Sequence, residues 1–307
     1  MNERISVIIP TYNPSYPVLT KAIDGLKSQT IASADWELII IDNNSSPAVT
    51  FDLDWKPGAR IIREATPGLT QARLAGFANS TGEIIVMVDD DNVLAANYLE
   101  NVRLLFAENE KVGAAGGKSI PRFESAPPPW LSAFFDNLAL RDLGENATVS
   151  SWKNAYPENA PIGAGMALRR VALNTYINKI HLIRDRTPGS LGSGGDNDMV
   201  IEIAKSGWEI GYFPVLLLEH LIPKNRTEVA YLSRLLNQSS RSWVLLLDSH
   251  DINPWPKIAP WTVPLRKIKA WISYRAWQDK VQYIRWRGAC GLYDGLAHKN
   301  KIDHSRV

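Results

Sequence analysis

Cysteine is nearly absent from the sequence, with Cys290 as the single example among 307 residues. One thiol cannot form an internal disulfide framework or a cysteine-based zinc site, and its isolation fits a reducing compartment. Long apolar runs are missing too, since no stretch reaches the length of a transmembrane helix. The chain enters a strand-like run at Ile5–Pro10, which leaves no room for a signal peptide. We therefore expect a cytoplasmic protein.

A glycine-rich loop is also missing after this first apolar run. Residues 11–16 read T-Y-N-P-S-Y, whereas a nicotinamide-dependent dehydrogenase needs G-x-G-x-x-G at this place to approach a pyrophosphate. Nucleotidyltransferases typically carry a glycine-rich loop with a basic residue here. The absence argues against a dehydrogenase and makes a nucleotidyltransferase the less favoured alternative.

Charge is distributed unevenly along the chain. The hydrophobic share of 45% and the charged share of 21% are those of a soluble globular protein, and the net charge is +2. From residue 257 onward, eleven Lys and Arg residues stand against only three acids, Asp279, Asp294 and Asp303. This tail is net +8 and the preceding residues are net −6, which predicts a basic appendage with its own partner.

Apolar runs alternate with helical patterns in the first half of the chain. The predicted strands are Ile5–Pro10, Trp36–Asp42, Ala59–Arg63 and Glu83–Asp89, and the predicted helices are Tyr16–Gln29, Gly68–Asn79 and Ala95–Glu108. This alternation predicts an α/β fold with a mostly parallel central sheet flanked by helices. Further on, we expect strands at Val112–Gly116, Ile162–Arg169 and within Trp208–Leu218, and helices at Asp196–Ser206 and Val229–Leu247.

Three consecutive carboxylates, Asp89, Asp90 and Asp91, close the fourth of these strands. Like charges at the end of a buried strand cost free energy unless a positive group compensates them. Mg²⁺ or Mn²⁺ would do so, because hard cations take carboxylate oxygens and often the phosphates of a substrate as well. A solvated acidic loop is the alternative. Position favours the metal site, because open α/β sheets bind ligands at the carboxyl ends of their strands.

Other residues with binding potential follow the predicted strands at the same edge of the sheet, or lie on the next helix: Pro10, Thr11, Tyr12, Asn13, Asp42 and Arg73. Each has a structural alternative. Prolines end strands, Asp42 fits an Asx turn, and a lone arginine on a helix usually faces solvent. Together, however, these residues form the pattern of a nucleotide cleft.

A glycine-rich segment, G-S-G-G-D-N-D at 192–198, runs into the later predicted helix. Either Asp196 or Asp198 can present a carboxylate to a substrate as a general base. Both also suit helix capping, which is compatible with catalysis. Downstream, His220 follows the apolar run Val215–Leu218. A lone histidine is more often structural, but beside an aspartate-bound metal it would make a third ligand.

The order of these motifs resembles glycosyltransferase family 2, whose members are inverting enzymes with the GT-A fold. The similarity begins with V-I-I-P-T-Y-N at 7–13 and continues with I-I-I-D-N-N-S at 39–45, P-G-L-T-Q-A-R at 67–73 and V-D-D-D-N at 88–92. It ends with G-G-D-N-D-M at 194–199, G-W-E-I-G-Y-F-P at 207–214 and H-L-I-P-K-N-R-T at 220–227. The resemblance covers about residues 5–245.

The resemblance implies a GT-A (Rossmann-like) fold and a set of site residues. The nucleotide-sugar site would comprise Pro10, Thr11, Tyr12, Asn13, Asp42, Arg73, Asp89 and Asp90. Within it, Asp42 would hydrogen-bond the base and Asp89 the ribose. Asp91 and His220 would bind the metal, with Asp89 as an alternative ligand. Asp196 occupies the position of the family's base, but the preceding position, usually Glu, is Gly195 here, so Asp198 remains the alternative base.

The reaction implied by the resemblance is a metal-dependent transfer, with inversion, of a sugar from a nucleotide-diphospho-sugar to an acceptor hydroxyl. The expected donor is a UDP-sugar and the expected cofactor Mn²⁺ or Mg²⁺. The acceptor would be a saccharide or lipid-linked saccharide of bacterial-type polysaccharide or glycolipid synthesis. A catalytically inactive sugar-nucleotide-binding or scaffold subunit is the alternative. The catalytic domain is expected at 1–250, with its nucleotide-binding half at about 1–118 and its acceptor-binding half at about 119–250.

Residues 251–307 are expected to form a basic, aromatic, helical extension. Tryptophans alternate there with basic residues, and the pattern at Lys267–Arg287 predicts one helix whose aromatic and cationic faces overlap. Basic amphipathic helices with tryptophan lie in the interface of anionic membranes. Residues 255–301 therefore predict peripheral association with the inner face of the cell membrane. Packing of the tryptophans onto the catalytic domain is the alternative, and nucleic-acid binding is not expected.

Overall fold

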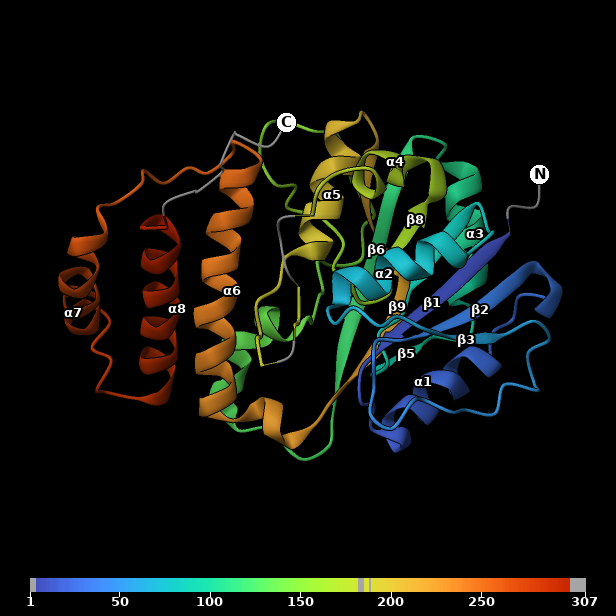
Figure 1. The fold of residues 1–307 in the computed structure, drawn as a ribbon, viewed down its shortest axis with the longest axis horizontal. Helices are drawn as coiled ribbons and strands as arrows, with labels where there is room; N and C mark the ends of the chain where they lie inside the picture. Colours follow the sequence, from blue (N-terminus) through green and yellow to red (C-terminus); the bar gives the residue numbers. More distant parts are fainter. Residues whose placement is uncertain (1–3, 182–184, 188, 299–307) are drawn as a thin grey trace.

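A nine-stranded sheet with helices on both faces forms the body of the protein (Figure 1). The computed structural model describes residues 4–181, 185–187 and 189–298. The strands follow the order β3-β2-β1-β4-β8-β6-β9-β5, and β7 pairs with β9. The end of the predicted extension, residues 299–307, lies outside the described residues. The α/β class predicted from the alternating pattern is confirmed.

The first half of the chain builds the parallel part of the sheet. Its elements are β1 (Ile5–Thr11), α1 (Tyr16–Lys27), β2 (Trp36–Asp42), β3 (Arg60–Arg63), α2 (Leu69–Asn79), β4 (Ile84–Met87) and α3 (Tyr98–Glu108). The strand pairs among these four strands are all parallel. β1, β2 and β4 are buried at every position, as expected for apolar strands covered on both faces.

The second half of the chain completes the sheet with long strands. β6 (Val112–Phe123) and β9 (Glu209–Ile222) are parallel to each other, and β8 (Ala167–Arg169) runs antiparallel between β4 and β6. The short strands β5 (Asn92–Leu94) and β7 (Thr148–Ser150) pair antiparallel with β9. Six of the nine strands therefore share one direction, which confirms the mostly parallel sheet.

The core lies in two apolar layers, one on each face of the sheet. Alternate residues of a strand point to opposite faces, so Val7 and Ile9 of β1 join α1 and α3 in one cluster, and Ile8 joins α2 in the other. The remaining elements are η1 (Ser33–Asp35), η2 (Pro129–Leu138), η3 (Arg170–Leu173), α4 (Asn174–Ile177), α5 (Gly195–Lys205), η4 (Lys224–Thr227), α6 (Val229–Ser249), η5 (Pro260–Thr262), α7 (Val263–Ser273) and α8 (Lys280–Leu296).

Three predicted elements are wrong in extent. The strand expected at Val112–Gly116 continues to Phe123 as β6. The strand expected at Ile162–Arg169 includes only its last three residues, because Gly165 has a φ of 73° and ends the extended conformation before β8. The single helix expected at Lys267–Arg287 is two helices, α7 and α8. Arg275 between them has a φ of 50°, and the Asp279 carboxylate accepts a hydrogen bond from the Gln282 N–H, which starts α8 anew.

The long helix α6 joins the C-terminal segment to the rest of the molecule. α8 lies alongside α6 in the same direction, and α7 lies beyond α8 at the outer edge (Figure 1). Ile284 of α8 shares an apolar cluster with residues of α6 and with Leu131 and Phe134 of η2. Glycines allow the close approach: a Cβ on Gly291 would lie 1.8 Å from the Asn237 carbonyl oxygen of α6.

Substituting Gly291 with Ala should separate α8 from α6, because the added methyl group overlaps the backbone of α6. We expect the free energy of unfolding to fall by about 1–3 kcal/mol, measured by urea unfolding. Gly288→Ala is the matched control, since its Cβ would have 3.5 Å to the nearest atom. It should be neutral or stabilising by up to about 1 kcal/mol through helix propensity. Equal losses in the two variants would contradict the close packing.

Candidate active site

The predicted acidic cluster and His220 meet at the carboxyl edge of the sheet. β4 ends at Met87, and the chain turns through Asp89–Asp91 into β5. β5 pairs antiparallel with β9, so that Asn92 stands opposite His220 and the Leu221 N–H donates to the Asp91 carbonyl at 2.8 Å. The short antiparallel pair thus brings together two motifs that are far apart in the sequence.

Asp91 is the centre of a buried polar cluster with His220 and Arg226. Its Oδ2 lies 2.8 Å from Arg226 Nη1 and 3.4 Å from His220 Nε2. Arg226 Nη1 also lies 3.3 Å from His220 Nε2, while His220 Nδ1 is buried without a hydrogen-bond partner. Arg226 was not among the predicted site residues. Its only signal in the sequence was its place in the segment that follows His220.

The three consecutive aspartates differ sharply in electrostatics. Burial alone would raise the pKa of Asp91, but His220 and Arg226 outweigh burial and lower that pKa to about 2. Burial and the neighbouring charge of Asp91 raise the pKa of Asp90 to about 7, although Thr11 Oγ1 donates a hydrogen bond to its carboxylate. Burial also raises the pKa of Asp89. The cluster therefore holds one firmly ionised carboxylate beside two that resist ionisation.

A cavity of about 630 Å³ opens beside this cluster. Asp90, Asp91 and Arg226 form one wall, and the loop after β1 with Tyr12 and Asn13 forms another. The lining also includes Ser15, Lys21, Arg122 and Glu124 together with apolar residues. The cavity thus offers cations, carboxylates and an exposed tyrosine ring, while Pro10 and Thr11 lie buried just behind it at the end of β1.

Asp42 and Asn13 fix the loops after β2 and β1, and of these the loop at Asn13 lines the cavity. Asp42 is buried, and its two oxygens accept hydrogen bonds from the backbone N–H groups of Ser45 and Val49. Burial alone would raise the pKa of Asp42, but these bonds and Arg63 hold it below its usual value. Asn13 has a φ of 46° and exchanges hydrogen bonds with the loop at Ser45 and Ser46.

Arg73 is buried among carboxylates rather than exposed on its helix. Its Nη1 lies 3.5 Å from Asp185 Oδ2, and it interacts electrostatically with Asp196 and Asp89. Burial raises the pKa of Asp185 to about 6, against the opposing charge of Arg73. Sequence reasoning missed Asp185, for which no motif gave a signal. Arg73 connects the aspartate cluster to the start of α5.

The two candidate bases on α5 have different surroundings. Asp196 Oδ2 accepts a hydrogen bond from the Gly163 N–H at 2.9 Å, and Asp196 Oδ1 accepts one from the Asn197 N–H at 3.0 Å. Asp198 is buried on another side, where its Oδ1 lies 2.7 Å from Lys179 Nζ and 2.7 Å from His250 Nε2. Only Asp196 is therefore grouped with Arg73.

Asp198, Glu202 and His250 bring potential metal-ligating atoms within 4.8 Å of one another. Among the described residues no other such group of three was found. Lys179 Nζ lies 2.7 Å from both carboxylates, so an ammonium group already supplies their positive charge. Unlike Asp91, none of these three residues lines the cavity beside the aspartate cluster, so we assign them a structural role.

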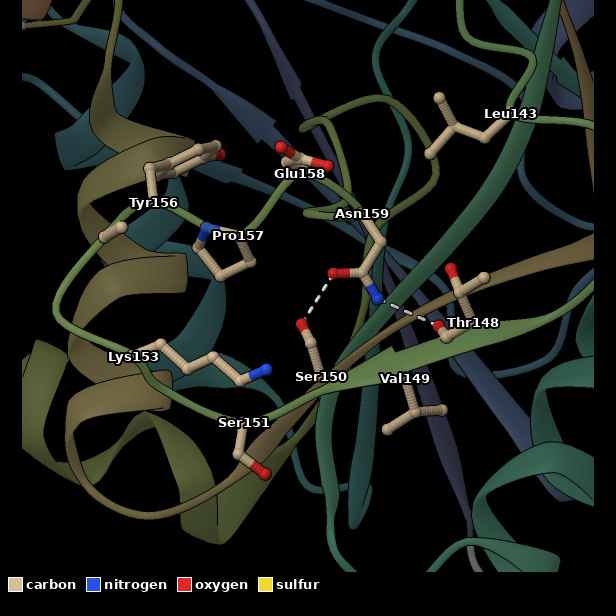
Figure 2. Close-up of a pocket in the computed structure, with 11 residues that line it drawn as sticks. Leu143, Thr148, Val149, Ser150, Ser151, Lys153, Tyr156, Pro157, Glu158 and Asn159 are labelled. Carbon is tan, nitrogen blue, oxygen red and sulfur yellow. Dashed lines mark hydrogen bonds between the residues drawn. The ribbon is translucent and has the colours of Figure 1, made fainter.

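A second cavity, of about 650 Å³, lies over β7 and the loop that follows it (Figure 2). The Ser150 hydroxyl donates to Asn159 Oδ1 at 2.6 Å, and Asn159 Nδ2 donates to the Thr148 carbonyl at 2.9 Å. Tyr156, on the wall of this cavity, accepts a hydrogen bond from Asn197 Nδ2 at 2.6 Å. The cavity therefore adjoins the first turn of α5, which carries Asp196.

The sequence model of Glycosyl transferase family 2 matches residues 6–173, more than half of the chain. The chain belongs to glycosyltransferase family 2. The match includes the loop after β1, Asp42, Arg73 and the three aspartates. The family predicted from the order of motifs is thereby confirmed.

Curated relatives support this assignment. An N-acetylglucosaminyltransferase of Mesorhizobium japonicum is 24% identical over 227 residues, covering 72% of this chain and 52% of that protein. The poly(ribitol-phosphate) β-N-acetylglucosaminyltransferase TarP of Staphylococcus aureus is 29% identical over 47% of this chain and 45% of its own length. The Escherichia coli UDP-Glc:α-D-GlcNAc-diphosphoundecaprenol β-1,3-glucosyltransferase WfgD is 30% identical over 31% of this chain and 38% of its own length. The chain thus spans about half or less of these relatives' lengths.

Solved structures show the same fold. Residues 1–349 of S. aureus TarS superpose with a TM-score of 0.52 at 12% identity, covering 96% of this chain and 90% of that one. The complex of TarS with UDP-GlcNAc gives a TM-score of 0.53 at 14% identity and the same coverage. The predicted GT-A fold is confirmed. Among the described residues, no helix is both long and apolar enough to cross a membrane.

Substituting Asp198 with Asn should destabilise the fold, because Lys179 and His250 would lose their buried anionic partner. Burial alone would raise the pKa of Asp198, but hydrogen bonds from His250 and Lys179 hold it below its usual value. The stabilisation is therefore present above about pH 4 and is lost as the pH falls through the folded-state pKa. We expect Asp198→Asn to lower the free energy of unfolding by about 3 kcal/mol at pH 7, measured by urea unfolding. The difference from the unaltered chain should become smaller below about pH 4.

Asp196→Asn is the matched control on the same turn of α5. In the described part of the chain, Asp196 forms no ion pair and accepts only backbone hydrogen bonds, so this variant should lose less than about 1 kcal/mol. A destabilisation by Asp196→Asn as large as that by Asp198→Asn would contradict the structural assignment of Asp198.

Proposed function

We propose that this chain transfers a sugar from a UDP-sugar to an acceptor hydroxyl, with inversion at the anomeric carbon and with a divalent cation. The observation that carries the proposal is the grouping of the Asp91–His220–Arg226 cluster with a cavity of about 630 Å³. Asp196, a carboxylate without a close cation, is connected to this cluster through Arg73. A leaving-group site and a base are both needed for the displacement.

The cavity suits a nucleoside diphosphate. Arg226 and Arg122 bring positive charge to its lining, which favours the diphosphate, and the exposed ring of Tyr12 offers a surface for a base. In this proposal Pro10, Thr11 and Asn13 shape the nucleoside side, and Asp42 reaches the base from the bordering loop. The UDP and UDP-GlcNAc complexes of TarS and the UDP-Glc donor in the name of WfgD support uridine as the nucleoside.

The residues around Asp91 fit a divalent cation that is shared with a substrate. Asp91 Oδ2 and His220 Nε2 offer two ligand atoms 3.4 Å apart, and His220 has its other nitrogen free of protein hydrogen bonds. Mg²⁺ is commonly held by one or two protein carboxylates together with substrate phosphates and waters. A cation bound here would neutralise the charge that develops on the diphosphate. In this proposal Asp89 contacts the ribose or the same ion.

Asp196 is the proposed base. Its carboxylate would accept the proton of the acceptor hydroxyl as that oxygen forms the bond to the anomeric carbon and the diphosphate leaves from the opposite side. The Gly163 N–H orients Asp196 Oδ2, and buried Arg73 places a positive charge in the surroundings of this carboxylate. Asp198 is disfavoured because Lys179 and His250 both already bond its Oδ1.

The second cavity is the proposed acceptor site. Hydroxyl, amide and carboxylate groups line it together with Tyr156, a set that matches the hydroxyls and apolar faces of a saccharide. The names of TarP and WfgD specify a polymer and a lipid-linked saccharide as acceptors of those enzymes. We place this chain likewise in polysaccharide or glycolipid synthesis, in the cytoplasm and at the inner face of the membrane.

The full chain should slowly release UDP from a UDP-sugar in the presence of Mn²⁺. Asp91→Asn should reduce this release by about 10²-fold or more, because the leaving diphosphate loses its cation. Chelation of Mn²⁺ should have the same effect on the unaltered protein. The exposed variant Asp24→Asn on α1 is the control and should leave the rate unchanged. UDP release that is insensitive to both Asp91→Asn and chelation would contradict the proposed metal site.

Filling the second cavity should weaken acceptor binding alone. Val149 is exposed on its wall, so Val149→Trp should raise the acceptor KM about tenfold, equivalent to about 1.4 kcal/mol, while UDP release stays constant. Val171→Trp, exposed outside the cavity, is the control. An unchanged acceptor KM would place the acceptor elsewhere.

The anomeric configuration of the product, read by NMR in the same experiment, should be inverted relative to the donor sugar. Retention of the donor configuration would contradict in-line displacement.

A further inference from the structure

The C-terminal helices expose an unusual concentration of large apolar side chains. Of the sixteen large hydrophobic residues that are exposed in the described part of the chain, seven fall between Trp255 and Trp277. The others are scattered over the rest of the molecule. Besides Trp277 at 60%, four of the seven are strongly exposed: Trp261 at 76%, Leu265 at 64%, and Ile268 and Ile272 at 59% each. Single exposed hydrophobics are ordinary, whereas a contiguous group marks an interaction surface.

These four residues share one face of α7 and of the turn before it. Their spacing of four, three and four residues places them along one stripe of a helix. We call this stripe, Trp261, Leu265, Ile268 and Ile272, the apolar face of α7. Trp277, also exposed, follows shortly after the helix ends. The stripe is longer than any other exposed apolar run on a described helix.

The opposite face of α7 is fixed to α8. The rings of Trp271 and Trp286 pack edge to face with centroids 4.7 Å apart, and Trp286 Nε1 donates to the Lys267 carbonyl at 3.0 Å. Lys267 Nζ also pairs with Asp294 at 2.7 Å. α7 lies beyond α8 at the outer edge of the molecule (Figure 1), and its apolar face is exposed rather than packed on α8.

Positive charge borders the apolar face. Arg266 and Lys269 lie on the same helix, Arg275 follows in the turn, and Lys280 begins α8. Among the described residues none of these four has a carboxylate partner. The two acids of residues 252–298 are already engaged, since Asp279 caps α8 and Asp294 pairs with Lys267. Cations flanking an apolar stripe complement an anionic lipid surface. A second copy of this chain would instead bring like charges together.

We propose that the apolar face of α7 inserts into the interface of an anionic phospholipid bilayer, with Arg266, Lys269 and Arg275 at the level of the headgroups. The division of the predicted Lys267–Arg287 helix into α7 and α8 changes which aromatic residues can contact lipid. Trp271, Tyr283 and Trp286 pack against one another between α7 and α8, while Trp261 and Trp277 remain on the surface. The surface takes no part in the proposed transfer reaction, so it is tested without a sugar donor.

The test is co-sedimentation of the full chain with vesicles. Vesicles of equal parts phosphatidylglycerol and phosphatidylcholine should bind the protein, and phosphatidylcholine vesicles should bind it at least about tenfold more weakly. Leu265→Gln combined with Ile268→Gln should lower binding to the anionic vesicles about tenfold or more, because binding scales with the buried apolar area. Arg266→Gln combined with Lys269→Gln should lower binding to anionic vesicles only.

Leu104→Gln combined with Val215→Gln is the matched control, since both residues are exposed elsewhere on the molecule. This variant should bind vesicles like the unaltered chain, and all variants should keep the same melting temperature because the substituted side chains face outward. Failure of the unaltered chain to bind anionic vesicles would overturn the proposal. So would binding that is unaffected by the Leu265 and Ile268 substitutions, or self-association that those substitutions abolish without any vesicle binding.

Discussion

The candidate active site depends on the compensation of buried negative charge. Burial penalises the ionisation of Asp89, Asp91 and Asp185, and two arginines compensate this penalty. Arg226 bonds Asp91, while Arg73 pairs with Asp185 and reaches toward Asp89 and Asp196. Carboxylates still outnumber these guanidinium groups, so the site remains attractive to a further cation. The same imbalance would make a donor diphosphate bind best together with its metal ion.

Much of the fold was predictable because its signals are local. β1, β2 and β4 are buried apolar runs, and such runs are easily recognised in a sequence. The failures have local causes as well: Gly165 with its positive φ shortens the strand expected before Arg169, and Arg275 with Asp279 divides the helix expected at Lys267–Arg287. The sequence pattern described the tail as aromatic and basic but did not separate tryptophans that face α8 from those that face outward.

The site residues were predictable only where they belong to motifs that can be recognised in the sequence. The edge of a parallel sheet explains why Thr11, Asp42 and Asp89–Asp91 gather, since strand ends meet there. Arg226 and Asp185 were missed because each acquires its role through a partner more than one hundred residues away, Asp91 and Arg73 respectively. The distinction between Asp196 and Asp198 likewise required the tertiary positions of Lys179 and His250. Spacing alone could not supply these contacts.

The parallel course of α6 and α8 has a geometric consequence. Because α8 runs in the same direction as α6, the connecting chain must return along its whole length, and α7 is the element that makes this return. With helices packed about 8–10 Å apart, the outer side of α7 stands roughly two helix spacings from α6. The close contact between Gly291 and Asn237 leaves α8 little freedom to move against α6. With α7 bound to a membrane, the three packed helices would fix the distance between the catalytic pocket and the membrane surface. That distance would determine how far an acceptor must extend from the membrane to reach the site.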